Sequence, residues 1–310
     1  MPLVLIWLVM TQPTFATSPL SNKHVAAAKL RDHVHVLAEK YAPRDYTHID
    51  NLNRCADYIR MHFKQAGATS TTFQTFSKFG QEYKNVVALF GDPEQERLII
   101  GAHYDAVTST PGADDNASGV AGLIELARPI AKLKPAQKIM LVAFSLEEPP
   151  FFDTAWMGSA VFAKSLLDAR KGVRIMIALE MIGYFSDEPG SQAYPISLLK
   201  LFYPDKGNFI AVVDQLFSNK ARKMKVIMRN NTEIPVRSIN APSVIPGVDF
   251  SDHKSFWQLG FPAVMITDTA FFRNKAYHTR HDTADRLDYE RMAQVVYGIF
   301  AYVRAISRRR

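Results

Sequence analysis

Five side chains of the kinds that bind metal ions are spread along the chain. They are His103, Asp115, Glu148, Glu180 and His278. Zinc is held by histidine nitrogen and carboxylate oxygen, and a catalytic zinc keeps one position open for water. Two such ions about 3.5–4 Å apart form a hydrolytic site. These residue types in this order therefore predict one site that holds two zinc ions.

The acidic pair Glu147–Glu148 adds a group suited to acid–base chemistry. Neighbouring residues at the end of a strand point in different directions, so one of the pair can bind metal while the other reaches the bound water. Zinc lowers the pKa of such water toward about 7, and a nearby carboxylate can pass its proton to a leaving amine. Two solvated surface acids are the alternative, and the apolar run before them, 138–144, argues against it.

The surroundings of the other ligands favour the same interpretation. Asp105 shares a face with His103 in an extended segment and can orient its imidazole. Asp115 lies in the glycine-bounded loop 112–119, where a carboxylate can bridge two cations, or where an acid or amide can instead cap the following helix. Glu180 ends an apolar run, and an acid there is costly unless it is paired or bound.

The elements that must position these residues alternate between strands and helices. Strands are expected at 71–76, 83–90, 97–103, 138–144, 173–179, 208–213 and 263–267, and helices at 24–40, 53–65, 118–133, 155–169 and 287–306. Apolar strands between helices predict an α/β, three-layer sandwich, with a mixed, largely parallel central sheet covered by helices on both faces. His103, the acidic pair and Glu180 all follow strand ends, and they converge if those strands are parallel neighbours.

Two further segments, 184–207 and 229–250, are rich in Pro, Ser, Asn and Gly. They are expected to be surface insertions that shape a substrate pocket.

The bulk composition is that of an ordinary globular protein. The chain has 310 residues, is 47% hydrophobic and carries a formal net charge of +7. Its basic residues are scattered except at Arg308–Arg310, and no recognition motif accompanies them, so nucleic-acid binding is not expected. A single cysteine, Cys55, excludes an intrachain disulfide.

The N-terminus has the pattern of a secretory signal. The apolar run 2–10 is shorter than the roughly twenty residues of a spanning helix, and Thr14-Phe15-Ala16 matches a cleavage site after Ala16. This predicts a signal at 1–16, a single peptidase domain at 17–310, a periplasmic or secreted location, and no membrane span after cleavage. A retained N-terminal anchor is the alternative.

The motifs, taken in order, resemble those of the zinc aminopeptidase family, whose relatives include glutamate carboxypeptidase II, the transferrin receptor and glutaminyl cyclase. The matching strings lie at 103–105, 112–119, 147–148, 179–181, 251–253 and 278–283. The resemblance runs from about residue 50 to the C-terminus and implies a zinc-exopeptidase-like fold.

The resemblance also implies a role for each site residue. One zinc would be held by His103, Asp115 and Glu180, and the other by Asp115, Glu148 and His278. Glu147 would be the general base and acid, and Asp105 would support His103. The implied activity is that of an exported two-zinc aminopeptidase, which attacks peptides with a free N-terminus through hydroxide held by zinc. The sequence indicates no oligomeric state.

The chain departs from the family pattern in two places. Glu180 stands where many members have aspartate, and the connection 149–157 is long and contains tryptophan, as in glutaminyl cyclases. Three aromatic residues of this connection could line a substrate pocket or belong to the core: Phe151, Phe152 and Trp156. Asp252, in the matching string 251–253, could supply a polar group to the pocket or cap the following helix.

Other functions on the same framework stay open. A one-zinc glutaminyl cyclase would form N-terminal pyroglutamate, and a carboxypeptidase or other amidohydrolase would use the same ligands. A non-catalytic binding module is a further alternative, but members of that class lose their ligands, and this chain has all five.

Overall fold

The protein is described by a computed structural model that covers residues 2–15, 25–91 and 96–307. The expected cleavage position at Ala16 and the basic cluster at 308–310 lie outside these ranges. Every predicted ligand and the whole of the expected sheet lie inside them.

One eight-stranded sheet runs through the molecule in the order β1-β2-β4-β3-β5-β8-β6-β7. The strands are β1 (Ser70–Lys78), β2 (Gln81–Phe90), β3 (Arg97–His103), β4 (Lys138–Phe144), β5 (Val173–Glu180), β6 (Ile210–Gln215), β7 (Val236–Ala241) and β8 (Ala263–Thr267). The central neighbours β4, β3, β5 and β8 are parallel. The pairs β1–β2, β2–β4 and β8–β6 are antiparallel, and β6–β7 is parallel.

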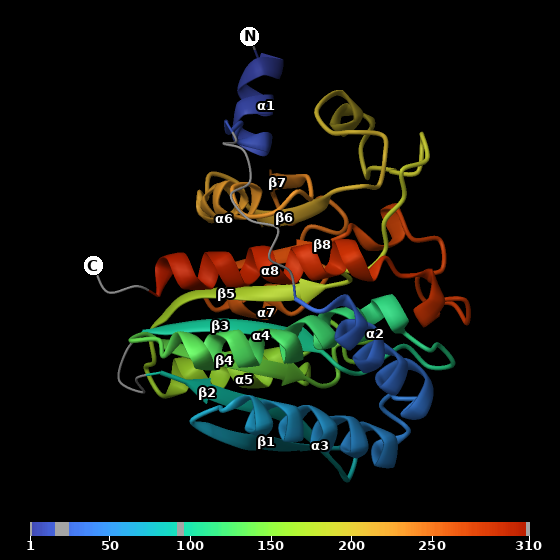
Figure 1. Ribbon diagram of the computed structural model, residues 1–310, viewed down its shortest axis with the longest axis vertical. Helices are drawn as coiled ribbons and strands as arrows, with labels where there is room; N and C mark the ends of the chain where they lie inside the picture. The colour runs from blue at the N-terminus through green and yellow to red at the C-terminus, as the bar shows by residue number, and fades with distance from the viewer. Residues whose placement is uncertain (1, 16–24, 92–95, 308–310) are drawn as a thin grey trace.

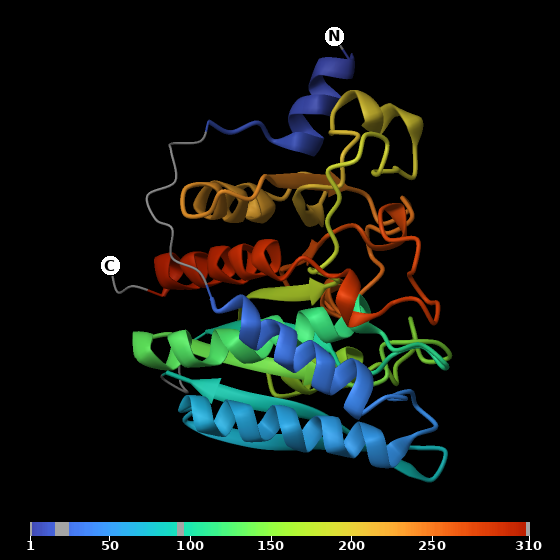
Figure 2. The same cartoon turned by 45° about the vertical axis from the view of Figure 1, so that its right-hand side comes forward.

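Helices cover both faces of this sheet (Figures 1 and 2). The α-helices of the described residues are α1 (Pro2–Thr11), α2 (Ala27–His35), α3 (Ile49–Ala66), α4 (Gly119–Leu133), α5 (Gly158–Asp168), α6 (Lys220–Arg229), α7 (His253–Gln258) and α8 (Tyr289–Ile306). A larger core joins the sheet to α2, α3, α4, α6 and α8, and a second core joins the other face to α5 and α7.

The expected three-layer α/β fold is confirmed. Strands β3 and β8 are buried along their whole length, as expected for apolar strands covered on both faces. Helix α3 ends at Gly67, whose φ of 96° is the left-handed conformation that favours glycine at a C-cap.

The chain from 220 to 258 differs from the sequence-based expectation. Helices α6 and α7 and strand β7 were not predicted, and 229–250 is not simply a surface insertion, because β7 forms an edge of the sheet. The sequence of β7, VRSINA, carries polar residues that hide its strand character. Helix α5 begins at Gly158 rather than 155, because turns occupy the preceding residues.

None of the helices within the described ranges is long and apolar enough to span a membrane.

Candidate metal centre

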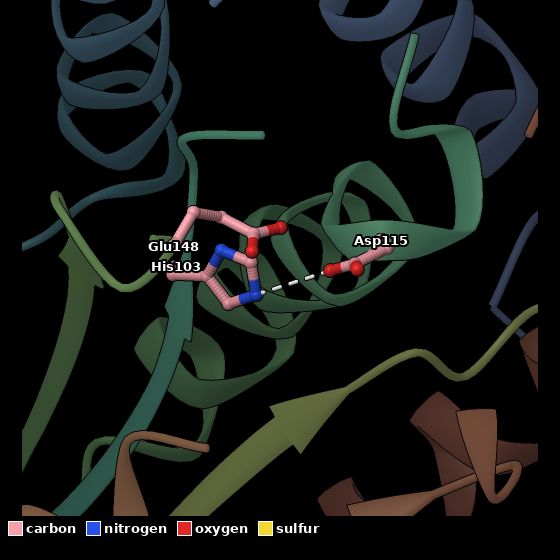
Figure 3. A group of neighbouring side chains, drawn as sticks. All are labelled: His103, Asp115 and Glu148. Carbon is pink, nitrogen blue, oxygen red and sulfur yellow. Dashed lines mark ion pairs between the residues drawn. The ribbon is translucent and has the colours of Figure 1, made fainter. Parts of the chain in front are cut away.

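The predicted ligands meet at the carboxyl edge of the parallel strands. His103 is the last residue of β3, Glu180 is the last residue of β5, and Glu147–Glu148 follow β4 after a short turn. Because β4, β3 and β5 are adjacent and parallel, their carboxyl ends lie side by side. Figure 3 shows His103 and Glu148 facing Asp115 across this edge.

Asp115 lies between the two histidines. Its Oδ1 is 3.3 Å from His103 Nε2, and its Oδ2 is 3.1 Å from His278 Nε2. The carboxylate therefore presents a different oxygen to each imidazole, as a bridging ligand does.

Each histidine also faces a second carboxylate. His103 Nε2 lies 3.4 Å from Glu180 Oε2 and 3.9 Å from Glu147 Oε2. His278 Nε2 lies 3.3 Å from Glu148 Oε2. One group, His103, Asp115 and Glu148, has ligand atoms that all lie within 4.8 Å of one another. All five predicted ligands and Glu147 thus form one cluster, and His281 lies outside it on the exposed surface.

The cluster is buried and strongly polarised. Burial raises the pKa of Glu147 well above its usual value, and the carboxylates of Glu180 and Glu148 add to this against the opposing effect of His103. Burial likewise raises the pKa of Glu148 to about 8. Burial alone would lower the pKa of His278, but Asp115 and Glu148 raise it to about 10. Without a bound cation, the negative charge of these carboxylates is offset by the positive charge of the two protonated histidines.

Several buried polar atoms at this centre lack a hydrogen-bond partner among the described residues. They are His103 Nε2, Asp115 Oδ1, Glu148 Oε1 and His278 Nε2. Buried polar groups without partners are rare in folded proteins and need an explanation. Imidazole nitrogens and carboxylate oxygens aimed at one point are the donor set of zinc, so these residues fit the metal.

Asp105 lies beside His103, as expected, and has a second contact with the centre. Its carboxylate is 3.6 Å from His103 Nδ1, and its backbone carbonyl is 3.2 Å from the same nitrogen. The carboxylate also accepts hydrogen bonds from the backbone amides of Glu147, at 3.1 Å, and Glu148, at 3.0 Å. It thus fixes the turn that carries the acidic pair as well as facing the imidazole.

Two polar residues hold the loop that carries Asp115. Asn116 donates to the Leu179 carbonyl at 2.8 Å and accepts from the Met181 amide at 3.1 Å, which ties this loop to the end of β5. Asp282 accepts from the Asp114 amide at 3.0 Å and from the Asp115 amide at 3.1 Å. Asn116 and Asp282 stand inside matching strings of the sequence, but their supporting roles were not predicted.

Arg44 is a buried cation that the sequence-based analysis missed. Its guanidinium donates to the backbone carbonyls of Tyr104, Pro111 and Gly112, next to two ligand loops. Burial lowers its pKa, and Asp282, Asp115 and Asp105 oppose this effect. No local pattern could have revealed it, because its described hydrogen bonds go to main-chain oxygens and three of their four acceptors lie at least 60 residues away.

The longer acid at position 180 has its own partner. The hydroxyl of Ser251, which is fully buried, donates to Glu180 Oε2 at 2.7 Å. This bond helps to fix the extra methylene that distinguishes Glu180 from aspartate.

An apolar pocket opens beside Glu180. Residues of the segments 192–199, 239–250 and 265–277 form much of its wall: Tyr194, Leu199, Ile239, Ile245, Val248, Met265, Phe272 and Tyr277. The two loop segments expected to shape a substrate pocket therefore contribute to it.

The four residues suggested for a substrate pocket are not among those that line this cavity. Phe151 is buried in the larger core against Tyr46 and Tyr83. Phe152 packs against Phe250, a pocket residue, and Trp156 is 38% exposed with Lys78 over its ring. Asp252 is buried, which raises its pKa to about 7.

The sequence from residue 85 to residue 303 matches the model of peptidase family M28. The chain belongs to this family. It is accordingly a zinc-dependent hydrolase, and its place among the zinc aminopeptidases agrees with the resemblance noted in the sequence.

The relatives of this M28 peptidase include proteins from bacteria and fungi. An uncharacterized protein of Escherichia coli, YfbL, is 48% identical over 94% of this chain and 92% of its own length. A probable leucine aminopeptidase of Trichophyton verrucosum is 23% identical over 96% of this chain and 81% of its own.

Solved structures share the fold at low identity. A zinc aminopeptidase from Bacillus subtilis has a TM-score of 0.71 at 14% identity, covering 92% of this chain and 96% of its own. A glutaminyl cyclase from Tannerella forsythia has a TM-score of 0.63 at 22% identity, covering 91% of this chain and 99% of its own.

Proposed function

We propose that this M28 peptidase uses two bound zinc ions to remove the N-terminal residue of peptides. We also propose that it works outside the cytoplasm. The observation that carries the proposal is the position of Asp115, whose two oxygens face His103 and His278 separately. Glu180 stands beside the first histidine and Glu148 beside the second. One zinc would be held by His103, Glu180 and Asp115, and the other by His278, Glu148 and the shared Asp115.

Zinc, when bound, supplies a Lewis acid that polarises the scissile carbonyl and lowers the pKa of water. Glu147 is buried beside these ligands and is placed by amide hydrogen bonds from its own turn to Asp105. Its carboxylate takes a proton from the attacking water and delivers it to the departing amine.

The pocket beside the cluster suits the first side chain of a peptide. This side chain can enter the apolar pocket next to Glu180 while the first carbonyl lies at the metal centre. Large apolar N-terminal residues are therefore the expected substrates.

A glutaminyl cyclase is the second candidate, supported by the fold likeness to the Tannerella forsythia enzyme. The complete second set of donors, Glu148 and His278 around Asp115, favours the peptidase. The tryptophan of the long connection, Trp156, is not among the residues that line the pocket.

Export is supported by the apolar segment 2–10 followed by Thr14-Phe15-Ala16. Residues 17–310 would form one peptidase domain, which would act in the periplasm or outside the cell.

The test is mass spectrometry of a peptide pool incubated with the zinc-loaded protein. The pool contains free, acetylated and Gln-initiated N-termini. Stepwise loss of single residues from free N-termini alone supports the aminopeptidase. Loss of ammonia from the Gln peptides without shortening would instead establish the cyclase, and shortening from the C-terminus would establish a carboxypeptidase.

A further inference from the structure

Helix α1 exposes an apolar surface at one end of the molecule. It packs against β7 and extends beyond it, at the top of Figures 1 and 2. Residues Leu3 to Leu8 are all apolar and are between 36% and 63% exposed. Contiguous apolar patches of this kind mark sites of interaction with proteins or membranes. The described part of the chain supplies no cover for this one.

The C-terminal end of α1 is fastened to the body by buried donors. Lys225 is 4% exposed, and its Nζ donates to the carbonyls of Thr11 and Gln12, both at 2.7 Å. Ser238 Oγ also donates to Thr11, at 2.6 Å. Without this segment, Lys225 would keep only Ser238 among these acceptors. Because an unpaired buried charge is costly, these bonds favour retention of the segment over cleavage after Ala16.

Cations gather around the base of α1. Burial and the repulsion of Arg229, Arg237 and Arg222 lower the pKa of Lys225 to about 8, so these four groups are close together. Within the described ranges none of the four forms a salt bridge. A cavity of about 270 Å³ lies between Trp7 of α1 and three of them, Lys225, Arg229 and Arg237. We call these four residues the cationic cluster.

An apolar helix beside unneutralised cations matches the chemistry of a bilayer surface. Acyl chains solvate the helix, and phosphate oxygens pair with the three arginines of the cationic cluster, which are at least partly exposed. A helix of 10 residues is about 15 Å long, roughly half of the hydrocarbon core, so α1 reaches into one leaflet only. A second copy of the chain is a poor cover, because it would bring a second cationic cluster to the same face.

Apolar loop residues flank the helix. Leu201 is 72% exposed, and its neighbour Phe202 lines the same cavity as Trp7. Phe217 is 79% exposed, and the carbonyl of its neighbour Ser218 accepts a hydrogen bond from Gln12. The apolar area at this end is therefore wider than α1 alone.

We propose that α1 and the cationic cluster form a membrane-docking face, which is retained after export and binds bilayers that contain anionic phospholipid. The inference is independent of the reaction at the metal centre, because it rests on residues at another part of the fold.

The test is sedimentation of the full chain with vesicles. Vesicles of phosphatidylcholine alone are compared with vesicles that also contain phosphatidylglycerol. The full chain should sediment with the anionic vesicles at least fivefold more than with the neutral ones, and added salt should weaken this binding. Leu5→Asp in α1 and Arg222→Glu, at the exposed member of the cationic cluster, should each reduce it at least fivefold.

Matched controls lie at the opposite end of the molecule. Phe79→Asp changes an exposed aromatic residue in the turn between β1 and β2, and Lys64→Glu reverses an exposed charge on α3. Both controls should bind like the parent, and all four variants should keep peptidase activity on soluble peptides. A full chain that stays in the supernatant with both vesicles overturns the proposal. Equal loss of vesicle binding in the two controls also overturns it. So does a mature protein whose intact mass is that of a chain beginning at Thr17.

Discussion

Glu147 is the residue on which the proposed chemistry depends most directly. Its carboxylate is buried beside His103, 3.9 Å from Nε2. Glu147→Gln keeps the size of the side chain but removes the proton acceptor. We expect kcat to fall by at least two orders of magnitude, the usual scale for a general base, while zinc content stays unchanged. The measurement is steady-state kinetics together with elemental analysis, and retained activity would reassign the base.

The two nearby histidines make a second test at the residue scale. His278 faces Asp115 and Glu148, whereas His281 is exposed. His278→Ala should lower zinc content, because it removes a ligand from the second set. His281→Ala is the matched control and should bind zinc like the parent. Equal losses in elemental analysis would contradict the assignment of the second set.

At the scale of elements, the pocket wall offers a test of specificity. Ile239 on β7 lines the apolar pocket, and Ile227 on α6 is an equally half-buried isoleucine outside it. Ile239→Asp should lower kcat/KM for N-terminal leucine at least tenfold, because the side chain loses an apolar surface worth over 1 kcal/mol. The kcat/KM for substrates with N-terminal arginine should fall less. Kinetics with both substrates tests this, and the same change in selectivity for Ile227→Asp would count against the pocket.

The residue patterns of the strands also explain how much of the fold could be predicted from the sequence. Strands β3, β4 and β8 were predicted with their observed bounds, because each is a continuous apolar run. The ligands at their ends could then be placed together, since parallel neighbours share one edge. Strand β7 was missed because polar residues interrupt its apolar ones, and it is stabilised by pairing with β6 rather than by its own pattern.

Supporting residues were harder to predict than ligands. Arg44 binds carbonyls of residues 104, 111 and 112, so its role exists only once the chain has folded. Phe151 and Tyr194 are both aromatic residues in irregular segments, yet one lies in the core and the other in the pocket wall. Residue type alone cannot separate these two outcomes, because loop geometry decides them.

At the scale of the whole molecule, zinc should contribute to stability. The fold holds Asp115, Glu147, Glu148 and Glu180 close together, and a cation offsets their repulsion. Zinc that binds only the folded state at 100 times its Kd adds about 2.7 kcal/mol per site to the free energy of unfolding. Urea unfolding before and after chelation should reveal this difference, and titration back should saturate at two ions. Unchanged stability, or saturation at one ion, would contradict the two-zinc centre.

A buried histidine should make stability depend on pH. His253 is fully buried, and burial lowers its pKa from 6.5 to about 4. The folded state therefore binds fewer protons than the unfolded state between these values, and stability is lost as pH falls from about 6.5 towards 4. His253→Gln can still donate to the Val248 carbonyl that accepts from His253 Nε2.

This variant should lose less stability than the parent between pH 7 and pH 5. The difference is at most about 2 kcal/mol, because pH 5 lies about 1.5 units below the unfolded pKa of 6.5 and each unit is worth about 1.36 kcal/mol. Urea unfolding of chelated protein at both pH values measures it, so that metal release does not contribute. His281→Gln, at an exposed position, serves as the control and should follow the parent. Parallel curves for parent and His253→Gln would show that His253 does not carry the effect.

Asp282 makes completion of the metal centre depend on a segment that is synthesised long after the first ligands. Its carboxylate shapes the loop of Asp115 from 167 residues downstream, and His278 enters the chain with it. A ribosome delivers residues 103–180 first, so a growing chain carries an incomplete set of ligands until residues 278–282 have been made. The second set of donors around Asp115 therefore assembles only after that point of synthesis.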